Sequence, residues 1–353
     1  MSTATGPGPD SSDRYAWITN HGEGDFGEVR DEDDFLHREG NPVGASVTET
    51  WYFGFHVAEA ALYGQIYVWF HPNLNVVTAG GMIARGFCRT SLSVDYFDHR
   101  AYLALDEHVN KTTGELRFPM GLVLTPILPM QQWRIQLDAP GQQTGFDLCA
   151  LAAQPPVIRA DGKHLDQNMR MQGELRLRGQ RYAVDCWQIR DRSWSNPRPE
   201  EAMPVPPYDW LTITRGDAFS MNISMFDDLA VLGNPGDALQ VPPKLLQDSW
   251  VCIGADSDAR LRRLVDVHKR TLRTADTLMP MRHEVTAIDD QGQRYELIGE
   301  SIGGCNWNGW PNMIWQQNLT RWTCNGELCW GESQEVKWHE TVRLLSQAGY
   351  DPR

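Results

Sequence analysis

The sequence lacks several features that would place it in a common class. No window approaches ~18 consecutive apolar residues, so we expect no membrane-spanning helix. The first residues contain neither a basic segment nor an apolar stretch; we therefore expect no secretory signal and interpret residues 1–13 as disordered. Positive charge is scarce: 32 Lys and Arg against 46 Asp and Glu give a formal net charge of −14. This balance argues against nucleic acid and anionic membrane surfaces as partners.

Motifs for nucleotides, metals and covalent catalysis are also missing. There is no P-loop, no GxGxxG after a strand, no GxSxG elbow and no CxxC pair. The seven cysteines are odd in number and widely spaced, which is typical of a reduced, cytoplasmic protein whose thiols fill the core; they are Cys88, Cys149, Cys186, Cys252, Cys305, Cys324 and Cys329.

Metal binding receives little support from the sequence. The segment 95–100 offers Asp95, Asp98 and His99, and His71 precedes a proline, but no HExxH or comparable spacing occurs. We interpret these residues as a solvated turn. No metal and no organic cofactor are expected.

What the sequence does contain is alternation with a period of two. Segments 172–189, 209–228 and 283–301 alternate apolar and polar residues, and the β-runs are separated by Gly, Asp and Pro turn positions. These patterns predict a mainly β protein with two consecutive antiparallel barrel or sandwich domains and few helices. Residues 258–272 fit either a helix or a strand, and the C-terminal segment 336–350 predicts a helix near its end.

A boundary between the two predicted domains is expected near residue 165. Segment 151–168 holds two prolines and little periodicity, and a new β series begins at residue 173. We therefore predict an N-terminal β domain over residues 14–165 and a C-terminal one over residues 166–353. The acidic run 30–40 is interpreted as a solvated segment.

Residues 182–199, YAVDCWQIRDRSWSNPRP, begin as a strand and end in a predicted turn that groups an acid, a base and an indole. If the strand continues, Asp191 and Ser193 face one side and Arg192 and Trp194 the other. In one interpretation Asp191 accepts a proton, Arg192 stabilises negative charge and Trp194 forms an apolar wall of a pocket. In the other, the same residues form a buried structural brace. Both interpretations remain open.

This segment resembles a known family. Its members carry a strand followed by Asp-(His/Arg)-Ser-Trp-Gly-x-Arg, and a later hairpin like residues 291–301, QGQRYELIGES. The family is the lipocalin-like group of carotenoid 1,2-hydratase (hydroxyneurosporene synthase) relatives and fungal Diels–Alderases. The chain departs from the motif at Ser195 and Asn196, and Arg198 matches loosely. The resemblance implies two consecutive β-barrels, an apolar pocket near their junction and no cofactor.

A second cluster occupies residues 49–64, ETWYFGFHVAEAALYG. It predicts an early strand with Trp51 among aromatic residues on one face, and Tyr52 and His56 on the other. His56 is interpreted either as a residue that exchanges protons near neutral pH or as a core histidine, and Glu59 could orient it.

A third cluster, residues 300–335, combines flat rings with amides, which suits either a ligand pocket or a sandwich core. Glu300 and Glu332 lie at its strand ends and would be general acids if burial raises their pKa. The residues expected to line a pocket here are Asn306, Trp307, Trp310, Trp315 and Trp330.

Together these features predict a cofactor-independent lyase, hydratase or isomerase that acts by acid–base chemistry on a hydrophobic terpenoid or aromatic molecule. The catalytic candidates are Asp191, His56, Arg192, Glu300 and Tyr52, and Trp51 and Trp194 join the substrate-binding set. A lignin-derived aromatic dimer that loses formaldehyde is a narrower expectation. The alternative is a non-catalytic carrier of a hydrophobic ligand, and a homodimer is left open.

Overall fold

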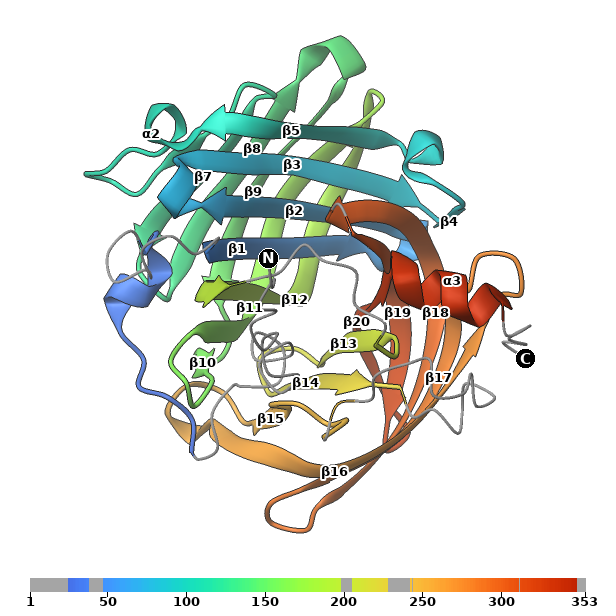
Figure 1. The fold of residues 1–353 in the computed structure, drawn as a ribbon. Helices are drawn as coiled ribbons and strands as arrows, with labels where there is room; N and C mark the ends of the chain where they lie inside the picture. The colour runs from blue at the N-terminus through green and yellow to red at the C-terminus, as the bar shows by residue number, and fades with distance from the viewer. Residues whose placement is uncertain are drawn as a thin grey trace, which may run out of the picture.

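The computed structural model describes residues 25–37, 47–197, 205–227, 242, 244–310 and 312–347. The segment predicted to be disordered, residues 1–13, and Arg198 of the family-like motif lie outside these ranges. Almost all described secondary structure is antiparallel β, as the alternation predicted, and it forms two curved sheets that lie one against the other (Figure 1).

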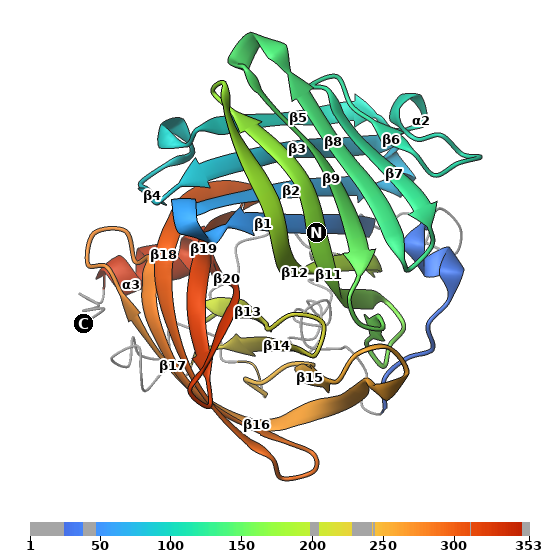
Figure 2. The ribbon, with the colours of Figure 1, turned by 180° about the vertical axis from the view of Figure 1, so that it is seen from behind.

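The first sheet has eleven strands in the order β5-β3-β2-β1-β12-β11-β9-β8-β7-β6, with β10 paired to β11. It curves like half of a barrel, and β5 and β6 form its two edges (Figures 1 and 2). Its strands are β1 (Val47–Val57), β2 (Leu62–His71), β3 (Val76–Arg85), β5 (Tyr96–Ala104), β6 (Leu116–Arg117), β7 (Leu122–Leu128), β8 (Gln132–Ala139), β9 (Thr144–Ala152), β10 (Val157–Ile158), β11 (His164–Leu177) and β12 (Gln180–Pro197).

The second sheet has nine strands in the order β17-β16-β15-β14-β13-β20-β19-β18-β4. An additional pairing of β17 with β18 closes eight of these strands into a barrel. Its strands are β4 (Phe87–Cys88), β13 (Tyr208–Thr214), β14 (Phe219–Phe226), β15 (Trp250–Ile253), β16 (Arg260–Arg273), β17 (Pro280–Asp289), β18 (Arg294–Trp310), β19 (Met313–Cys324) and β20 (Glu327–Trp338).

The two sheets divide later than the boundary expected near residue 165. Strands β11 and β12 belong to the first sheet, because β12 pairs with β1 over register partners from Val47 to Tyr52. The chain passes to the second sheet between Pro197 and Tyr208. In the opposite direction, β4 leaves the N-terminal half and pairs in parallel with β18. Strand β4 of the N-terminal half therefore belongs to the second sheet, and β12 of the predicted C-terminal domain pairs with β1 in the first sheet. These exchanges connect the two sheets directly.

Helices are short. Apart from single 3-10 turns, the described residues contain α2 (Leu105–His108) and α3 (His339–Gln347), so the helix predicted near the C-terminus is confirmed. The ambiguous segment 258–272 is a strand, because β16 bridges β15 and β17. No helix in the described ranges is both long and apolar enough to cross a membrane.

Three large apolar clusters follow from this arrangement. One fills the concave side of the first sheet and one lies inside the barrel. The third lies between the sheets and draws residues from both, among them Tyr52 and Trp69 from the first sheet and Trp210 and Trp307 from the second. The thiols mostly fill these cores: all seven cysteines lie in the described residues and are unpaired, and six of them are buried. The third cluster is the region where the predicted site segments meet.

The acidic segment 30–40 is interpreted from sequence as solvated, but the structure buries one of its acids. Its Asp34 is fully buried and accepts hydrogen bonds from Arg190 Nη1 at 2.6 Å and Trp133 Nε1 at 2.9 Å. Sequence composition misjudged this residue because the cations that compensate its charge lie more than 150 positions away.

Candidate functional site

The strongest acid–base arrangement lies between the sheets and joins Tyr52 on β1 to Glu332 on β20. The Tyr52 hydroxyl donates a hydrogen bond to Glu332 Oε2 at 2.5 Å, and Gln317 Nε2 donates to the same hydroxyl at 2.5 Å. Gln334 Nε2 donates to Glu332 Oε2 at 2.8 Å. The Glu332 backbone amide donates to Thr212 Oγ1, which fixes the strand at this point. Both side chains are almost completely buried.

The carboxyl group of Glu332 approaches the backbone of β1 at Gly54. A Cβ atom added at Gly54 would lie 2.7 Å from Glu332 Oε1 and 2.9 Å from the Tyr52 hydroxyl oxygen. Such contacts are too short for a side chain, so the glycine makes room for the carboxyl group. Nothing in the sequence singles out this glycine, since its partner lies on a distant strand.

The environment of Glu332 raises its pKa. Burial disfavours the charged form and raises the pKa from 4.5 to about 7, although hydrogen bonds from Tyr52, Gln334 and Gln317 act in the opposite direction. Among the described residues no Lys or Arg forms an ion pair with Glu332. Burial and the adjacent Glu332 raise the pKa of Tyr52 well above 10, so Tyr52 remains a proton donor. Burial therefore raises the pKa of Glu332, which is the condition that a general-acid role for this residue requires.

A pocket of about 280 Å³ lies further along the two strands that carry this pair, and neither Tyr52 nor Glu332 lines it. We call it the His56 pocket; it is lined by His56, Val57, Ala58, Glu59, Ala183, Asp185, Cys186, Trp187, Thr214, Arg215, Gly216, Leu328 and Trp330. Both sheets contribute to it, and the ring centroids of His56 and Trp330 lie 5.9 Å apart. His56 and Trp330 stand two residues from Gly54 and Glu332 on the same strands, so they lie on the same strand faces as Gly54 and Glu332.

His56 does not suit the proton exchange near neutral pH that we predicted. Burial lowers its pKa from 6.5 to about 4, and its Nδ1 is buried without a hydrogen-bond partner. At neutral pH the ring is therefore uncharged. It remains a polar group in the wall of the pocket, able to bind a neutral ligand but poorly suited to carry a proton.

Of the two interpretations given for Arg192, the catalytic one and the buried structural brace, its geometry matches the brace. It is fully buried, donates to Glu49 Oε1 at 2.9 Å and to the Phe35 backbone carbonyl at 2.7 Å, and lies 3.9 Å from the ring centroid of Trp51. Burial lowers the pKa of Arg192, although the charges of Glu49 and Asp34 favour its charged form. Because its Nη1 and Nη2 donors are engaged inside the first sheet, the structure does not bring it to the Tyr52–Glu332 pair.

Residues 191–197, predicted to form a turn, continue strand β12. Successive side chains there point to opposite faces of the sheet. Trp51 packs in the core of the first sheet, and Trp194 stacks on His37 with ring centroids 4.4 Å apart. Neither lies in the cluster between the sheets that holds Tyr52. We had expected both to bind substrate; their neighbours are those of core residues.

Asp191 lies on the side of β12 that faces the second sheet. It is the register partner of Tyr52 on β1 and of Asp166 on β11. Its charge contributes to the raised pKa of Tyr52. The structure thus brings two predicted catalytic residues, Asp191 and Tyr52, to one place, and adds Glu332 to them.

The tryptophans of β18 and β19 pack mainly on one another and on the first sheet. Trp310 stacks on Trp69 with centroids 3.8 Å apart, and Trp307 stacks on Trp315 at 5.5 Å. Trp310 Nε1 donates to the Tyr67 hydroxyl at 3.3 Å. These rings form a wall between the sheets, while Trp330 alone of the predicted set lines the His56 pocket.

Two other predicted residues lie elsewhere. Asn306 pairs across strands with Gln316 and, by alternation, lies on the opposite face of β18 from Trp307. Glu300 is 44% exposed at its side chain and forms ion pairs with Arg282 and Arg321. Hydrogen bonding from Arg321 lowers the pKa of Glu300, so the burial on which its predicted general-acid role depended is missing.

Two groups of side chains in the described residues have ligand atoms close enough for a metal ion, and neither includes Asp95, Asp98, His99 or His71. In the first, His164 Nε2 lies 3.0 Å from Asp166 Oδ1, and Trp250 Nε1 donates to Asp166 Oδ2 at 2.9 Å; the third member is Asp191.

The second group, Asp209, Asp227 and Glu335, lies inside the barrel. Its carboxylates already form ion pairs with Lys269, Arg273 and Lys337. Three buried acids thus meet three buried bases, and ammonium and guanidinium groups occupy the places that a cation would take. This network is best explained as a structural one.

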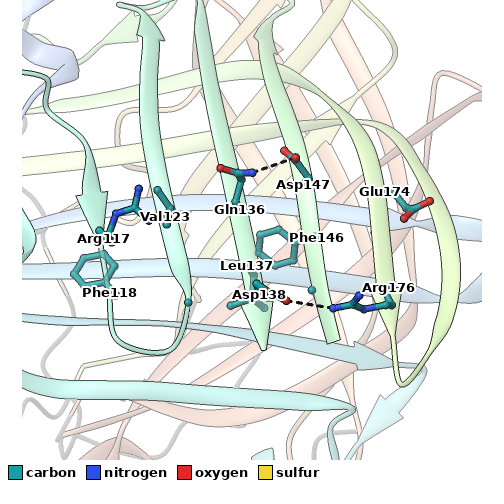
Figure 3. Close-up of a pocket in the computed structure, with 12 residues that line it drawn as sticks. Arg117, Phe118, Val123, Gln136, Leu137, Asp138, Phe146, Asp147, Glu174 and Arg176 are labelled. Carbon is teal, nitrogen blue, oxygen red and sulfur yellow. Dashed lines mark hydrogen bonds and ion pairs between the residues drawn. The ribbon is translucent and has the colours of Figure 1, made fainter. Parts of the chain in front are cut away.

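A larger hollow of about 600 Å³ lies on the other side of the first sheet, across β7, β8, β9 and β11 (Figure 3). Figure 3 shows charged and amide side chains along its strands, with Gln136 bonded to Asp147 and Arg176 to Asp138. None of the predicted site residues lines it, and most of its polar side chains face water. The arrangement between the sheets is therefore the better candidate.

Comparison with known proteins places the chain in a family. A family profile described as "Domain of unknown function (DUF7064)" matches residues 30–340. The chain belongs to this family. A comparison with curated protein sequences finds no match.

Solved structures share the fold of this DUF7064 protein. An AttH candidate from Nitrosomonas europaea is similar with a TM-score of 0.61 and 12% identity, over 89% of this chain and 97% of that one. CghA is similar with a TM-score of 0.50 and 12% identity, over 83% and 88% of the two chains. Kievitone hydratase from Nectria haematococca gives a TM-score of 0.49 and 11% identity, over 86% and 93%. At these identities the likeness concerns architecture, and the lipocalin-like fold implied by the family resemblance is confirmed.

Proposed function

We propose that this protein is a cofactor-independent enzyme in which Glu332 and Tyr52 move a proton to or from a hydrophobic terpenoid or aromatic molecule held between the two sheets. The observation that carries the proposal is a buried carboxyl group with a pKa of about 7, hydrogen-bonded by a buried tyrosine. A general acid or base works best when its pKa lies near the operating pH. Perturbed groups of this kind cluster at functional sites.

The chemistry available to such a pair is addition or removal of water, or migration of a double bond. In hydration, Glu332 gives its proton to one carbon of a C=C bond, water adds its oxygen to the other carbon, and the water's second proton returns to the carboxylate. Dehydration is the reverse. Isomerisation uses the same carboxyl group to add a proton at one carbon and remove one at another. Each such group typically contributes ~10²–10⁴-fold to the rate.

The surroundings favour an apolar substrate. Tyr52 packs edge-on against Trp210 with centroids 5.9 Å apart, and the cluster between the sheets is rich in aromatic rings. Flat rings with a few polar groups suit a planar or polyene body. A lignin-derived aromatic dimer belongs to this class, and release of formaldehyde from it would need a base on the alcohol, a role that ionised Glu332 could fill. Asp191 is the second acid–base candidate because it pairs with Tyr52 across the strands.

The test is a mass-spectrometric screen of purified protein against terpenoids and lignin-type aromatics, with no cofactor added. We expect conversion of at least one compound, lost ~10²-fold or more in Glu332→Gln. Glu174→Gln is the control, since Glu174 has a 52% exposed side chain that pairs with Arg181 on the surface. Equal conversion by wild type and Glu332→Gln would overturn the assignment. A ligand that binds and returns unchanged would indicate a carrier.

A further inference from the structure

Arg159 is a buried arginine whose guanidinium group donates no hydrogen bond to another side chain of the described residues. It follows β10, is 4% exposed, and its Nε is buried without an acceptor. In the described part of the chain no side chain accepts a hydrogen bond from it and no carboxylate forms an ion pair with it. Arg192 also has a buried Nε without an acceptor, but its Nη atoms donate to Asp34 and Glu49, and Arg190 donates to Asp34. A buried N–H donor without an acceptor is costly, which points to a ligand that supplies the missing acceptor.

The groups around Arg159 come from both sheets. Burial disfavours its charged form, but Tyr208, Asp166, Asp248 and Asp191 outweigh burial and raise the pKa of Arg159. The Tyr208 hydroxyl is hydrogen-bonded with Ser224. Asp166 is held by His164 and Trp250 as described above, and Arg263 donates to Asp248 Oδ1 at 3.0 Å. Arg159 therefore stands near four acidic or phenolic groups, none of which takes up its donors.

The charges around Arg159 favour an uncharged ligand. Three carboxylates lie near a single unpaired guanidinium group, so a carboxylate or phosphate ligand would be repelled by them. An uncharged carbonyl oxygen adds no charge and accepts the donors that Arg159 offers. The aromatic rings of Tyr208, Phe226 and Trp250 belong to the apolar cluster between the sheets and provide a surface for the ligand's body.

The position of Arg159 also relates it to the acid–base pair. Asp191 acts electrostatically on both Arg159 and Tyr52, and it is the cross-strand partner of Tyr52. Trp210, the next residue of β13 on the same face as Tyr208, packs on Tyr52. A molecule that contacts Arg159 at one end is thus directed along the sheet interface toward Tyr52.

We propose that Arg159 is a substrate-binding residue that donates hydrogen bonds to the carbonyl oxygen of an uncharged, largely apolar ligand, such as an aromatic ketone, enone or lactone. This assignment rests on the proposed function only in one respect, namely that the ligand extends from Arg159 toward Tyr52. The binding itself can be measured without turnover.

The experiment compares three probes of one shape by titration calorimetry: 2-acetylnaphthalene, 2-ethylnaphthalene and 2-naphthoate. We expect wild type to bind the ketone more tightly than the other two. Arg159→Met should weaken ketone binding about 10-fold or more, the range for a hydrogen bond to a charged group, and leave 2-ethylnaphthalene binding unchanged. Arg159→Lys should retain part of the preference. Arg181→Met is the control, because Arg181 is exposed and pairs with Glu174 on the surface.

Several results would overturn the proposal. They are equal ketone binding, or none, by wild type and Arg159→Met; tighter binding of 2-naphthoate than of the ketone; or a lower melting temperature of Arg159→Met without a change in probe preference. Glu332→Gln separates the two proposals. If it keeps turnover while ketone binding depends on Arg159, the proposed function fails and this inference stands. If it abolishes turnover while Arg159→Met has no effect on ketone binding, only this inference fails.

Discussion

The hydroxyl of Tyr52 lies 2.5 Å from Glu332 Oε2, although the two residues are 280 positions apart in the chain. The contact joins β1 of the half-barrel to β20 of the closed barrel. It places a carboxyl group where water is largely excluded and gives it a short hydrogen bond from Tyr52, beside the bond from Gln334. The chemical behaviour proposed for the site follows from this one relationship.

The free energy of unfolding should decrease as the pH rises toward neutrality, and Glu332→Gln should abolish the part of this decrease that is due to Glu332. The pKa of Glu332 is raised in the folded protein, to about 7 from 4.5. Its contribution to the free energy of unfolding is therefore fully present below pH 4.5 and is lost as the pH rises through 7, a change of about 3 kcal/mol. Urea unfolding at pH 4.5, 6 and 8 should show wild type losing stability relative to Glu332→Gln over this range.

Glu174→Gln should follow wild type in the same series, since its side chain is exposed. A constant difference between wild type and Glu332→Gln from pH 4.5 to 8 would mean that Glu332 ionises normally in the folded state.

His56 should remain uncharged throughout the neutral range. Burial lowers its pKa to about 4, so its contribution to stability is present above pH 6.5 and is lost as the pH falls toward 4. Nitrogen NMR of labelled histidine should show a neutral His56 ring at pH 6. The exposed His268 is an internal reference in the same spectra, because its side chain is 82% accessible. Titration of His56 between pH 6 and 7 would restore the proton-exchange role that we now reject.

Arg192→Met should destabilise the fold by about 3–5 kcal/mol, because it leaves the buried carboxylates Asp34 and Glu49 short of a partner. Chemical denaturation measures the loss. Arg181→Met should change stability by less than about 1 kcal/mol, as is usual for an exposed ion pair. If Arg192→Met folds as stably as wild type but loses turnover, Arg192 acts on substrate and the brace interpretation is wrong.

Gly54→Ala should impair turnover more than Gly141→Ala. The added methyl group at Gly54 would meet Glu332 Oε1 at 2.7 Å and displace the carboxyl group from Tyr52, whereas a Cβ at Gly141 has open space around it. Misplacement of a reacting group by about 1 Å can cost ~10²-fold in rate. Steady-state kinetics on any compound found in the screen measures the effect. Equal rates for the two alanine variants would show that the close approach has no catalytic importance.

The fold was largely accessible from sequence because its signals are local. Alternation and turn residues predicted the β13–β14 and β17–β18 hairpins, and the C-terminal periodicity predicted α3. The turn expected after Asp191 is wrong for a non-local reason: pairing with β1 keeps β12 extended to Pro197, with Ser195 accommodated in a left-handed conformation at φ 55°.

The site was only partly accessible. Tyr52, Asp191 and Glu332 could be singled out as acid–base residues, but burial decides their pKa, and burial depends on contacts between distant strands. Arg192 was ambiguous for the same reason, since Asp34 and Glu49 compensate its charge from residues 158 and 143 positions away. Gly54 and Arg159 carry no sequence signal, because their importance lies in a close approach and in a missing partner.

The most direct test of the central claim is the titration of Glu332 itself, followed by carbon NMR of glutamate side-chain carboxyl groups in wild type and Glu332→Gln. The account predicts one glutamate resonance that titrates near pH 7 in wild type and is absent from the variant. If every glutamate carboxyl group in wild type is ionised by pH 5.5, Glu332 is an ordinary carboxylate and the proposed acid–base chemistry is contradicted.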